Sequence, residues 1–275
     1  MAPGAAQFAL VMGAALALAS CGPQVLVVVD DQVRPIHRYS FDGAGTTVTD
    51  SIGNADGVVV GAALTGMGSL TLAGNRNQAQ YVVLPPRRFA ELRDATLEAW
   101  VNWAGPTINS VSTPWQRIFD FGEGSTGVAD EQAPGGGPAR SYLFLTPQTD
   151  PRTATEVPST RVAFQVPHDP QAVALETVVN TSPLPIGVDT HVAVVIDASN
   201  HRMSLFVDGA IVGATDLAQD DPLSYVYDVN DWLGRSQFGQ DPGFTGTFLE
   251  FRIYAIALTS EQMQASYNAG PRAPR

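Results

Sequence analysis

The stretch of residues 189–213 constrains the fold of this chain most strongly. It consists of three apolar runs, separated by a polar turn at residues 198–201 and by Asp208-Gly209. Asp-Gly between apolar runs predicts a two-residue hairpin turn of type I′, because both central residues of that turn need a positive φ. The first run is largely apolar on both of its alternating sides. This predicts a strand that is covered on both faces, as in a sandwich of two sheets.

The rest of the chain continues in short strands at the spacing typical of an all-β sandwich. The clearest is residues 95–103, where Leu97 and Val101 share one face and Glu98 and Trp100 share the other. Further strands are expected at residues 36–41, 58–62, 69–72, 79–84, 116–121, 141–145, 161–166, 172–179 and 246–258. Long loops are expected at residues 122–140, 146–160 and 216–231.

One short helix is expected near the C-terminal end of the chain. Thr259 can cap its first turn together with Gln262, three residues further on, in a capping box. Gly270 followed by Pro271 ends it, since glycine adopts the left-handed conformation of a helix C-terminus and proline cannot continue a helix.

Length and charge limit the partners that the chain can have. With 275 residues it suits one large β domain plus a leader. The formal net charge of −12 argues against nucleic acid, because such a surface repels phosphates. The same charge leaves room for cations, above all calcium, which binds oxygen ligands.

The N-terminal segment is typical of an exported bacterial lipoprotein. Residues 8–19 form an apolar run of signal-peptide length that ends in Leu-Ala-Ser-Cys21, which resembles a lipobox, and Cys21 is the only cysteine. We therefore expect a signal peptide at residues 1–20 and a lipid on Cys21. The anchor would hold the protein at the cell envelope, with the outer membrane favoured over plain secretion. The alternative is one membrane span at residues 8–29, which would place Pro23 inside a helix.

Several segments together resemble the laminin G-type branch of the concanavalin A-like lectins and glucanases. In chain order they are HRYSFDG (37–43), DSIGN (50–54), GSLTLAG (68–74), YVVLP (81–85), ATLEAWVNW (95–103), RIFDFG (117–122), HVAVVID (191–197), MSLFVDGAIVG (203–213), WLGRS (232–236) and FTGTFLEFRIYAIALTSEQM (244–263). The resemblance implies a jelly roll of two antiparallel sheets with one short C-terminal helix. It gives a linker at residues 21–35, the sandwich at residues 36–270 and a tail at residues 271–275.

The sequence favours a protein that is not an enzyme. The related glucanases carry Glu-x-Asp-x-x-Glu on one strand, which supplies a nucleophile and a general acid. Here the nearest acidic run, Glu91, Asp94 and Glu98, has the wrong spacing. We expect Glu98 to be a solvated or salt-bridged residue. Other catalytic motifs, such as Gly-x-Ser-x-Gly and His-Glu-x-x-His, do not occur.

Calcium is the cofactor that the resemblance makes plausible, because many such sandwiches bind it at a rim or between the first and last strands. The first predicted ligand set is Asp42, Asp50, Asn54 and Glu250. Asp42 and Asp50 could instead only fix turns through their side chains. A weaker set lies in the loop of residues 216–231, with Asp220, Asp221, Asp228 and Asp231. His37 and His191, on strands, are interpreted as hydrogen-bonded packing residues.

Four aromatic residues in loops are the candidates for ligand binding: Trp115, Tyr225, Tyr227 and Phe238. Sugars stack their CH faces on aromatic rings, but such residues can also pack beneath long loops as small apolar clusters. We predict a non-enzymatic binding module at the bacterial cell envelope that recognises a polysaccharide or a glycosylated surface through rim loops. Alternatives are an adhesion or structural module that binds a surface protein, an accessory subunit of a surface complex, and a glycan hydrolase with an atypical site.

Overall fold

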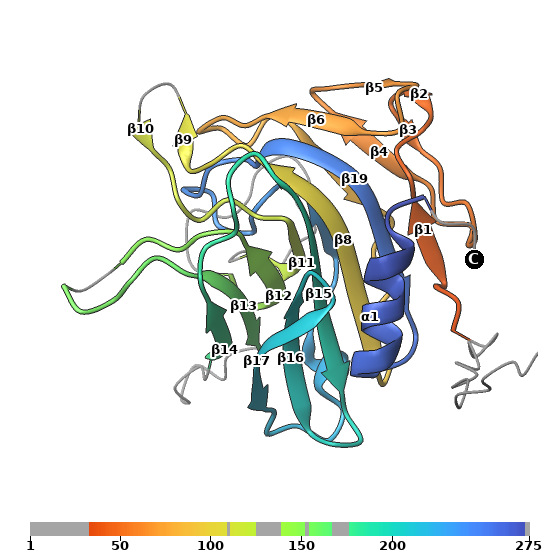
Figure 1. Cartoon of the computed structure of the whole chain (residues 1–275), viewed down its shortest axis with the longest axis vertical. Coiled ribbons are helices and arrows are strands. Elements are labelled where there is room, and N and C mark those ends of the chain that lie inside the picture. Colours follow the sequence, from red (N-terminus) through yellow and green to blue (C-terminus); the bar gives the residue numbers. More distant parts are fainter. Residues whose placement is uncertain (1–32, 109–110, 125–138, 152–153, 167–175, 273–275) are drawn as a thin grey trace, which may run out of the picture. The chain divides into compact units, whose positions relative to one another are not determined.

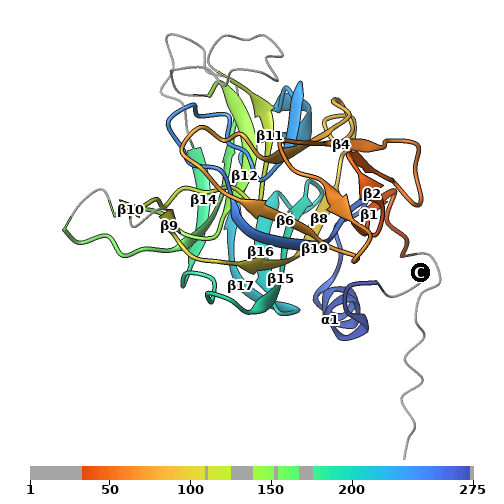
Figure 2. The same cartoon turned by 90° about the horizontal axis from the view of Figure 1, so that it is seen from above.

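The computed structural model describes residues 33–108, 111–124, 139–151, 154–166 and 176–272. The predicted signal peptide, Cys21 and most of the linker lie outside these residues. No helix within the described ranges combines the length and apolar character that a membrane span requires. Residues from Val33 onward form one compact unit made of two antiparallel sheets (Figures 1 and 2).

The first sheet contains seven strands and includes both strands that the sequence marks most clearly. Its order is β1 (His37–Tyr39), β19 (Thr245–Tyr254), β8 (Ala95–Trp103), β15 (Asp189–Asp197), β16 (Arg202–Val207) and β17 (Ala210–Asp216), with β6 (Leu70–Ala73) also paired to β19. The first strand of the domain therefore lies beside the last, as in a jelly roll.

The second sheet contains eight strands. Its order is β14 (Glu176–Thr181), β13 (Thr160–Gln165), β12 (Ser141–Thr146), β11 (Phe119–Glu123), β18 (Asn230–Leu233), β7 (Tyr81–Leu84), β4 (Gly57–Val60) and β3 (Thr47–Val48). Two small ribbons, β2 (Ala44–Gly45) with β5 (Leu64–Thr65) and β9 (Thr107–Ile108) with β10 (Val111–Ser112), complete the described strands.

The two sheets enclose one large apolar core. Strand β8 contributes Leu97 and Val101, and strand β12 contributes Leu143 and Leu145, all fully buried. Because successive residues of a strand point to opposite sides, their neighbours face outward. Tyr142 and Phe144 accordingly belong to a separate apolar cluster on the outer face of the eight-stranded sheet. The predicted all-β sandwich is confirmed.

The hairpin between β16 and β17 has the turn predicted from Asp208-Gly209. Asp208 and Gly209 have φ values of 49° and 77° and connect Val207 to its strand partner Ala210. A positive φ at both positions is the signature of type I′.

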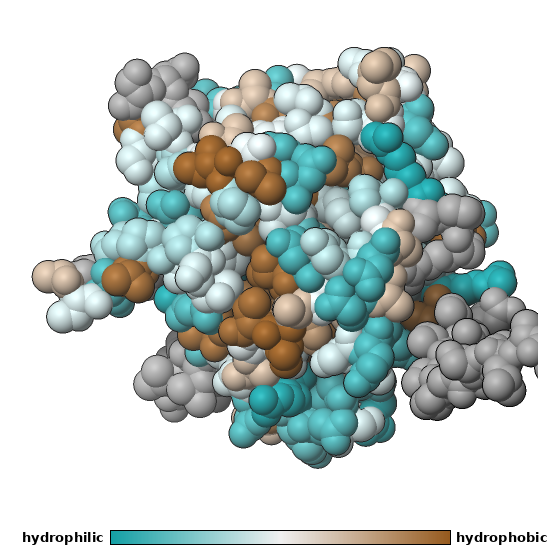
Figure 3. Space-filling model, in the orientation of Figure 1, coloured by the Kyte–Doolittle hydropathy of each residue, from teal (hydrophilic) through white to brown (hydrophobic). Residues whose placement is uncertain are grey.

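Helix α1 (Ser260–Ala269) lies on the outer face of the seven-stranded sheet, on the side away from the other sheet (Figures 1 and 2). The capping box of Thr259 and Gln262 is present in full, as predicted. Met263 and Leu258 are buried against Val195 and Phe206 of the sheet. In Figure 3 the surface over α1 is mainly hydrophilic, and apolar side chains gather beside it over β17, where Ile211 and Val212 are exposed.

Some predicted boundaries were wrong. The last strand ends at Tyr254 rather than at residue 258, because the chain turns into the approach to α1. The loop of residues 216–231 contains a short 3-10 helix, η1 (Pro222–Tyr225), and its end already belongs to β18. Residues 125–138 and 152–153 of the other two predicted loops lie outside the described ranges.

Candidate functional site

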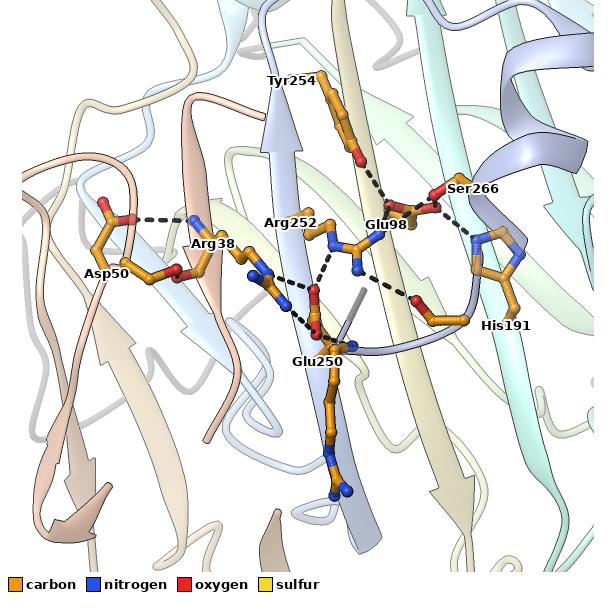
Figure 4. Close-up of polar contacts among 11 residues, drawn as sticks. Arg38, Asp50, Glu98, His191, Glu250, Arg252, Tyr254 and Ser266 are labelled. Atoms are coloured by element: carbon orange, nitrogen blue, oxygen red, sulfur yellow. Dashed lines mark hydrogen bonds and ion pairs between the residues drawn. The ribbon is translucent and has the colours of Figure 1, made fainter. Parts of the chain in front are cut away.

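A buried charge network lies between α1 and the seven-stranded sheet (Figure 4). At its centre the Arg252 guanidinium donates to Glu98 on β8, at 3.3 Å, and to Glu250 on its own strand. It also contacts Ser266 of α1, at 3.3 Å. All four residues are fully buried. The network therefore ties the helix to the sheet.

A β-bulge places Glu250 in this network. The register of β19 against β8 shifts between Phe248 and Glu250, so Leu249 is an extra residue in the strand. Phe248 before the bulge and Phe251 after it both point into the core, an odd spacing that only an inserted residue allows. Glu250 consequently faces outward, on the same side as Arg252.

Glu98 is fully buried, so the solvated interpretation was wrong and the salt-bridged one is confirmed. It accepts hydrogen bonds from the Tyr254 hydroxyl (2.9 Å) and from Ser266. His191 Nδ1 accepts from the Gly209 N–H, so the Nε2–H donates to Glu98 at 2.9 Å. Burial alone would raise the pKa of Glu98, but the His191 hydrogen bond and the Arg252 charge outweigh burial and lower it.

The structure does not assemble the first predicted calcium ligands. Asp42 and Asn54 are exposed. Both oxygens of the buried Asp50 are occupied: by the His37 ring at 2.6 Å and by four backbone N–H groups, those of residues 38, 52, 53 and 55. Both oxygens of Glu250 accept from Arg38, Arg252 or the backbone N–H of Arg272.

Such saturated carboxylates leave a cation no lone pairs, so these residues as placed do not fit calcium. Asp50 instead stabilises the turn between β3 and β4, which agrees with the alternative interpretation. Calcium binding by the protein itself stays a prediction.

The weaker predicted set is also divided. Asp220 and Asp221 are exposed, whereas Asp228 and Asp231 are buried. Across the described ranges, no three His, Cys, Asp or Glu side chains form a group that could hold a metal ion. His37 and His191 are hydrogen-bonded packing residues, as interpreted from the sequence.

Two of the four candidate aromatic residues, Trp115 and Phe238, come together over the outer face of the eight-stranded sheet. They border a cavity of about 350 Å³, which we call the aromatic pocket. Its lining is Trp115, Arg117, Ala139, Tyr142, Phe144, Gln165, Glu176, Phe238 and Asp241. Both aromatic rings are half-buried and pack against the cluster of Tyr142 and Phe144, so the predicted satellite packing is present, and the same two residues border the aromatic pocket.

Trp115 holds an unusual backbone conformation at the edge of this pocket. Its φ is 69°, which is rare and costly for a bulky residue. Its N–H donates to Gln148 O at 2.9 Å, and its carbonyl accepts from Arg117 at 2.6 Å. The surrounding chain thus stabilises a strained residue whose ring borders the pocket.

Arg117 forms the floor of the aromatic pocket. Its guanidinium is buried, lies 3.9 Å from the centre of the Phe144 ring, and pairs with Asp120 at 3.2 Å and with Asp241 at 2.7 Å. Asp241 also accepts from Ser236 at 2.8 Å. The donors of Arg117 are therefore directed at partners within the protein.

Asp120, beneath the pocket, is less well satisfied than Glu98. One of its oxygens accepts from Arg117 and from the Gln237 N–H, and the other is buried without a hydrogen bond from any residue that the structure describes. Burial raises the pKa of Asp120 to about 7, against the opposing charge of Arg117. Burial thus favours the protonated form of this carboxyl more than in an exposed aspartate.

The other two candidates do not belong to the aromatic pocket. Tyr225 is 47% exposed and Tyr227 is 49% exposed, and Tyr227 borders a second pocket. Three residues of the aromatic pocket were not predicted from the sequence: Arg117, Tyr142 and Phe144. One available signal was the alternation in SYLFL (141–145), which is apolar on both sides and so indicates a cluster outside the core.

The sandwich, its helix-covered first sheet and the open aromatic pocket on its second sheet define a lectin-like binding fold. A laminin G-type family model, described as the concanavalin A-like lectin/glucanases superfamily, matches residues 75–264. The chain belongs to this superfamily, as the sequence resemblance predicted. No curated protein matches the chain.

Solved structures share the fold at low sequence identity. Domain 4 of AbnA, an extracellular arabinanase of Geobacillus stearothermophilus in complex with arabinotriose, is 20% identical with a TM-score of 0.57, over 84% of this chain and 97% of that domain. The Trypanosoma rangeli sialidase is 16% identical with a TM-score of 0.58, over 87% of this chain and 33% of the sialidase. The binding domain of botulinum neurotoxin serotype D/C is 12% identical with a TM-score of 0.56, over 86% and 52%.

Proposed function

We propose that this protein is a non-enzymatic module that binds carbohydrate in the aromatic pocket. The observation that carries the proposal is the pairing of Trp115 and Phe238 over a cavity of about 350 Å³ with polar groups in its wall. Pockets that hold small ligands are of this size and combine apolar surface with a few placed polar groups. Aromatic rings provide faces for the CH groups of a sugar, and Gln165 and Glu176 offer partners for its hydroxyls.

The charges of the pocket favour a neutral sugar over an acidic one. Among the described residues of its lining, the cation is Arg117, which is already paired with two carboxylates. Glu176 and Asp241 add negative charge to the wall, with Arg161 4.0 Å from Glu176. An anionic ligand would lose solvation without gaining a free cation.

The carboxylates of the pocket support a binding role rather than hydrolysis. Asp241 accepts from Arg117 and Ser236, and the Tyr142 hydroxyl lies 2.8 Å from Glu176. A glycosidase needs one carboxylic acid and one carboxylate free to act on the two sides of a glycosidic bond. An assay for reducing ends released from any bound glycan separates the two functions.

The direct test is a glycan array followed by calorimetry on each glycan that binds. We expect neutral glycans to bind and Trp115→Ala to weaken binding roughly thirtyfold, which corresponds to about 2 kcal/mol for a central aromatic contact. The matched control is Tyr225→Ala, an exposed aromatic residue outside the pocket, which should bind normally. An array without hits would contradict the proposal and favour a protein partner.

The cellular location is a separate part of the proposal. The lipobox-like segment supports export and a lipid on Cys21 at the cell envelope. Labelling with a radioactive fatty acid in a bacterial host should mark the wild-type protein and not Cys21→Ala, which should also leave the membrane fraction. Equal labelling of both proteins would contradict the anchor.

Calcium is tested by thermal melting with the ion and with a chelator. Because a ligand of the native state raises the melting temperature by mass action, a shift would establish a calcium site. Because the oxygens of Asp50 and Glu250 already have their hydrogen-bond partners, we expect any such shift to persist in Asp42→Ala. Loss of the shift in that variant would support the calcium ligands predicted from the sequence.

A further inference from the structure

A second pocket lies at one end of the eight-stranded sheet, where β7 and β11 end and β18 begins. It has a volume of about 380 Å³ and we call it the rim pocket. Its lining includes Glu123 at the end of β11, Asp228 and Tyr227 before β18, and Arg87 and Glu91 after β7. Neither the aromatic pocket nor the network beneath α1 shares these residues.

Glu123 is the feature of the rim pocket that points to a ligand. Its side chain is only 5% exposed. One carboxylate oxygen accepts from Arg140 at 3.2 Å, while the other is buried and has no hydrogen-bond partner among the described residues. A buried carboxylate oxygen without a donor is costly, so a donor that enters the pocket would be favoured there. Burial also raises the pKa of Glu123, and this effect exceeds the opposite effect of the Arg140 charge, which lowers it.

The other charges of the rim pocket favour a cationic donor. Asp228 is 2% exposed and one of its oxygens accepts from the N–H groups of Phe89 and Ala90, at 3.1 and 3.2 Å. Burial raises the pKa of Asp228 as well. Glu91 adds a third carboxylate at the surface, and the guanidinium of the exposed Arg87 adds an opposing positive charge.

The size of the pocket and its ligand atoms favour an organic cation over a metal ion. Within the described parts of the chain, no three acidic, histidine or cysteine side chains converge as a metal site, at this pocket or elsewhere. A protonated amine needs fewer ligands, since one carboxylate oxygen and backbone carbonyls satisfy its three N–H groups. The cavity has room for the carbon skeleton that carries such an amine, and Tyr227 presents a half-exposed ring beside it.

We propose that the rim pocket binds the protonated amino group of a small organic ligand, with the unpartnered oxygen of Glu123 as its principal acceptor. Tyr227 packs against the carbon skeleton of the ligand, and Asp228 adds negative charge without releasing its backbone hydrogen bonds. An amino sugar and a lysine side chain carry the same group, and either source satisfies this chemistry.

The test is calorimetry on the purified protein with three probes: an oligomer of glucosamine, the same oligomer fully N-acetylated, and a blocked lysine amide. At least one amine should bind, and the acetylated oligomer should bind at least about tenfold more weakly because its amine is no longer charged. The stronger of the two amines identifies the source. Failure of both amines to bind would overturn the proposal. Measurable binding of the glucosamine oligomer that is no tighter than that of its acetylated form, in a protein whose aromatic pocket is disabled by Trp115→Ala, would overturn it as well.

Single substitutions show whether the amine binds in the rim pocket. Glu123→Gln should weaken amine binding at least about tenfold, since it keeps the shape of the side chain and removes its charge. The matched control Glu91→Gln, a surface glutamate of the same pocket, should change it far less. Trp115→Ala should leave amine binding intact, which separates this site from the aromatic pocket. Unchanged amine binding in Glu123→Gln would overturn the proposal, and if that variant does not fold, unchanged binding in Tyr227→Ala would do so.

Discussion

The two outer faces of the sandwich carry the same structural motif in two different surroundings. On each face a buried arginine lies over an aromatic ring and pairs with two carboxylates: Arg252 over Trp100 with Glu98 and Glu250, and Arg117 over Phe144 with Asp120 and Asp241. On the seven-stranded sheet, α1 covers the motif. On the eight-stranded sheet, the motif forms the floor of an open pocket.

The difference lies in how completely the polar groups are satisfied. Under α1, both oxygens of Glu98 have partners, supplied by the helix, the sheet and the His191 ring. Under the aromatic pocket, one oxygen of Asp120 has none. A buried network in which every polar group has a partner favours one arrangement of the strands and helices that contribute to it. A buried network with an unpaired polar group destabilises the folded state. The network on the covered face therefore stabilises the packing of α1 on its sheet, and the open face is the one on which we propose that a ligand binds.

The largest effect expected from this comparison comes from the two arginines. Arg252→Met leaves Glu98 buried without its arginine and Glu250 paired with Arg38 alone, and we expect a loss of about 3–5 kcal/mol in the free energy of unfolding. Arg117→Met should lose less, roughly 1–3 kcal/mol, because Asp120 can take up a proton and Asp241 is partly exposed. Urea unfolding of both variants measures the difference. Equal losses in the free energy of unfolding would show that the two arginines stabilise the two faces to the same extent.

The same arginine variants should separate stability from binding. Arg117→Met removes the group that holds the carbonyl of Trp115, so glycan binding should fall together with a modest loss of stability. The matched variant Arg252→Met, studied below its lowered melting temperature, should bind with wild-type affinity because its network lies on the opposite face.

The pH dependence of stability should have opposite signs on the two faces. The pKa of Asp120 is raised to about 7 from an ordinary value of 3.8, so the folded state holds the proton more tightly. Its contribution to stability is present below pH 4 and is lost as the pH rises toward 7. The pKa of Glu98 is lowered from 4.5, so its contribution is present above that pH and is lost on acidification through the folded-state pKa.

Asp120→Asn isolates the contribution of the open face. The variant should lose the part of the decline in stability between about pH 4 and pH 7 that Asp120 contributes, an effect on the order of a few kcal/mol. The declines contributed by Glu123 and Asp228, whose pKa values burial also raises, and the loss on acidification set by Glu98 remain. Urea unfolding across this pH range measures both the loss of stability on raising the pH and the loss on acidification. An unchanged profile would mean that Asp120 does not titrate in the folded protein as its burial requires.

The smallest expected effect concerns the cap of α1. Thr259→Ala removes the side chain that accepts from the Gln262 N–H and should cost about 1 kcal/mol of stability. Glycan affinity should not change, because α1 lies on the covered face. A loss of binding in this variant would link the two faces and weaken the distinction between them.

The sequence predicted most of the fold because the fold depends on local patterns. Alternation identified β8 and β15, Asp208-Gly209 identified a type I′ turn, and Thr259 with Gln262 identified the start of α1. Each of these signals is contained within a few residues, where strand period, turn geometry and capping act.

The candidate site could be predicted only in part. Loop position and aromatic character selected Trp115 and Phe238, but their meeting depends on the packing of segments far apart in the chain. Glu250 was assigned to a calcium site because the extra residue Leu249, which turns it toward Arg252, has no signature in the sequence. The role of Arg117 was missed for a similar reason, since its carboxylate partner Asp241 lies on a distant loop.

The most direct test of the central claim follows the indole N–H signals of the four tryptophans by NMR during a titration with a neutral glycan. Trp115 borders the aromatic pocket, whereas Trp100 lies in the covered network and Trp103 in the core. We predict that the Trp115 signal shifts and saturates with the glycan while the Trp100 and Trp103 signals stay in place. A glycan that binds with the Trp115 signal unmoved, or that moves the Trp100 signal instead, would contradict a binding site on the open face.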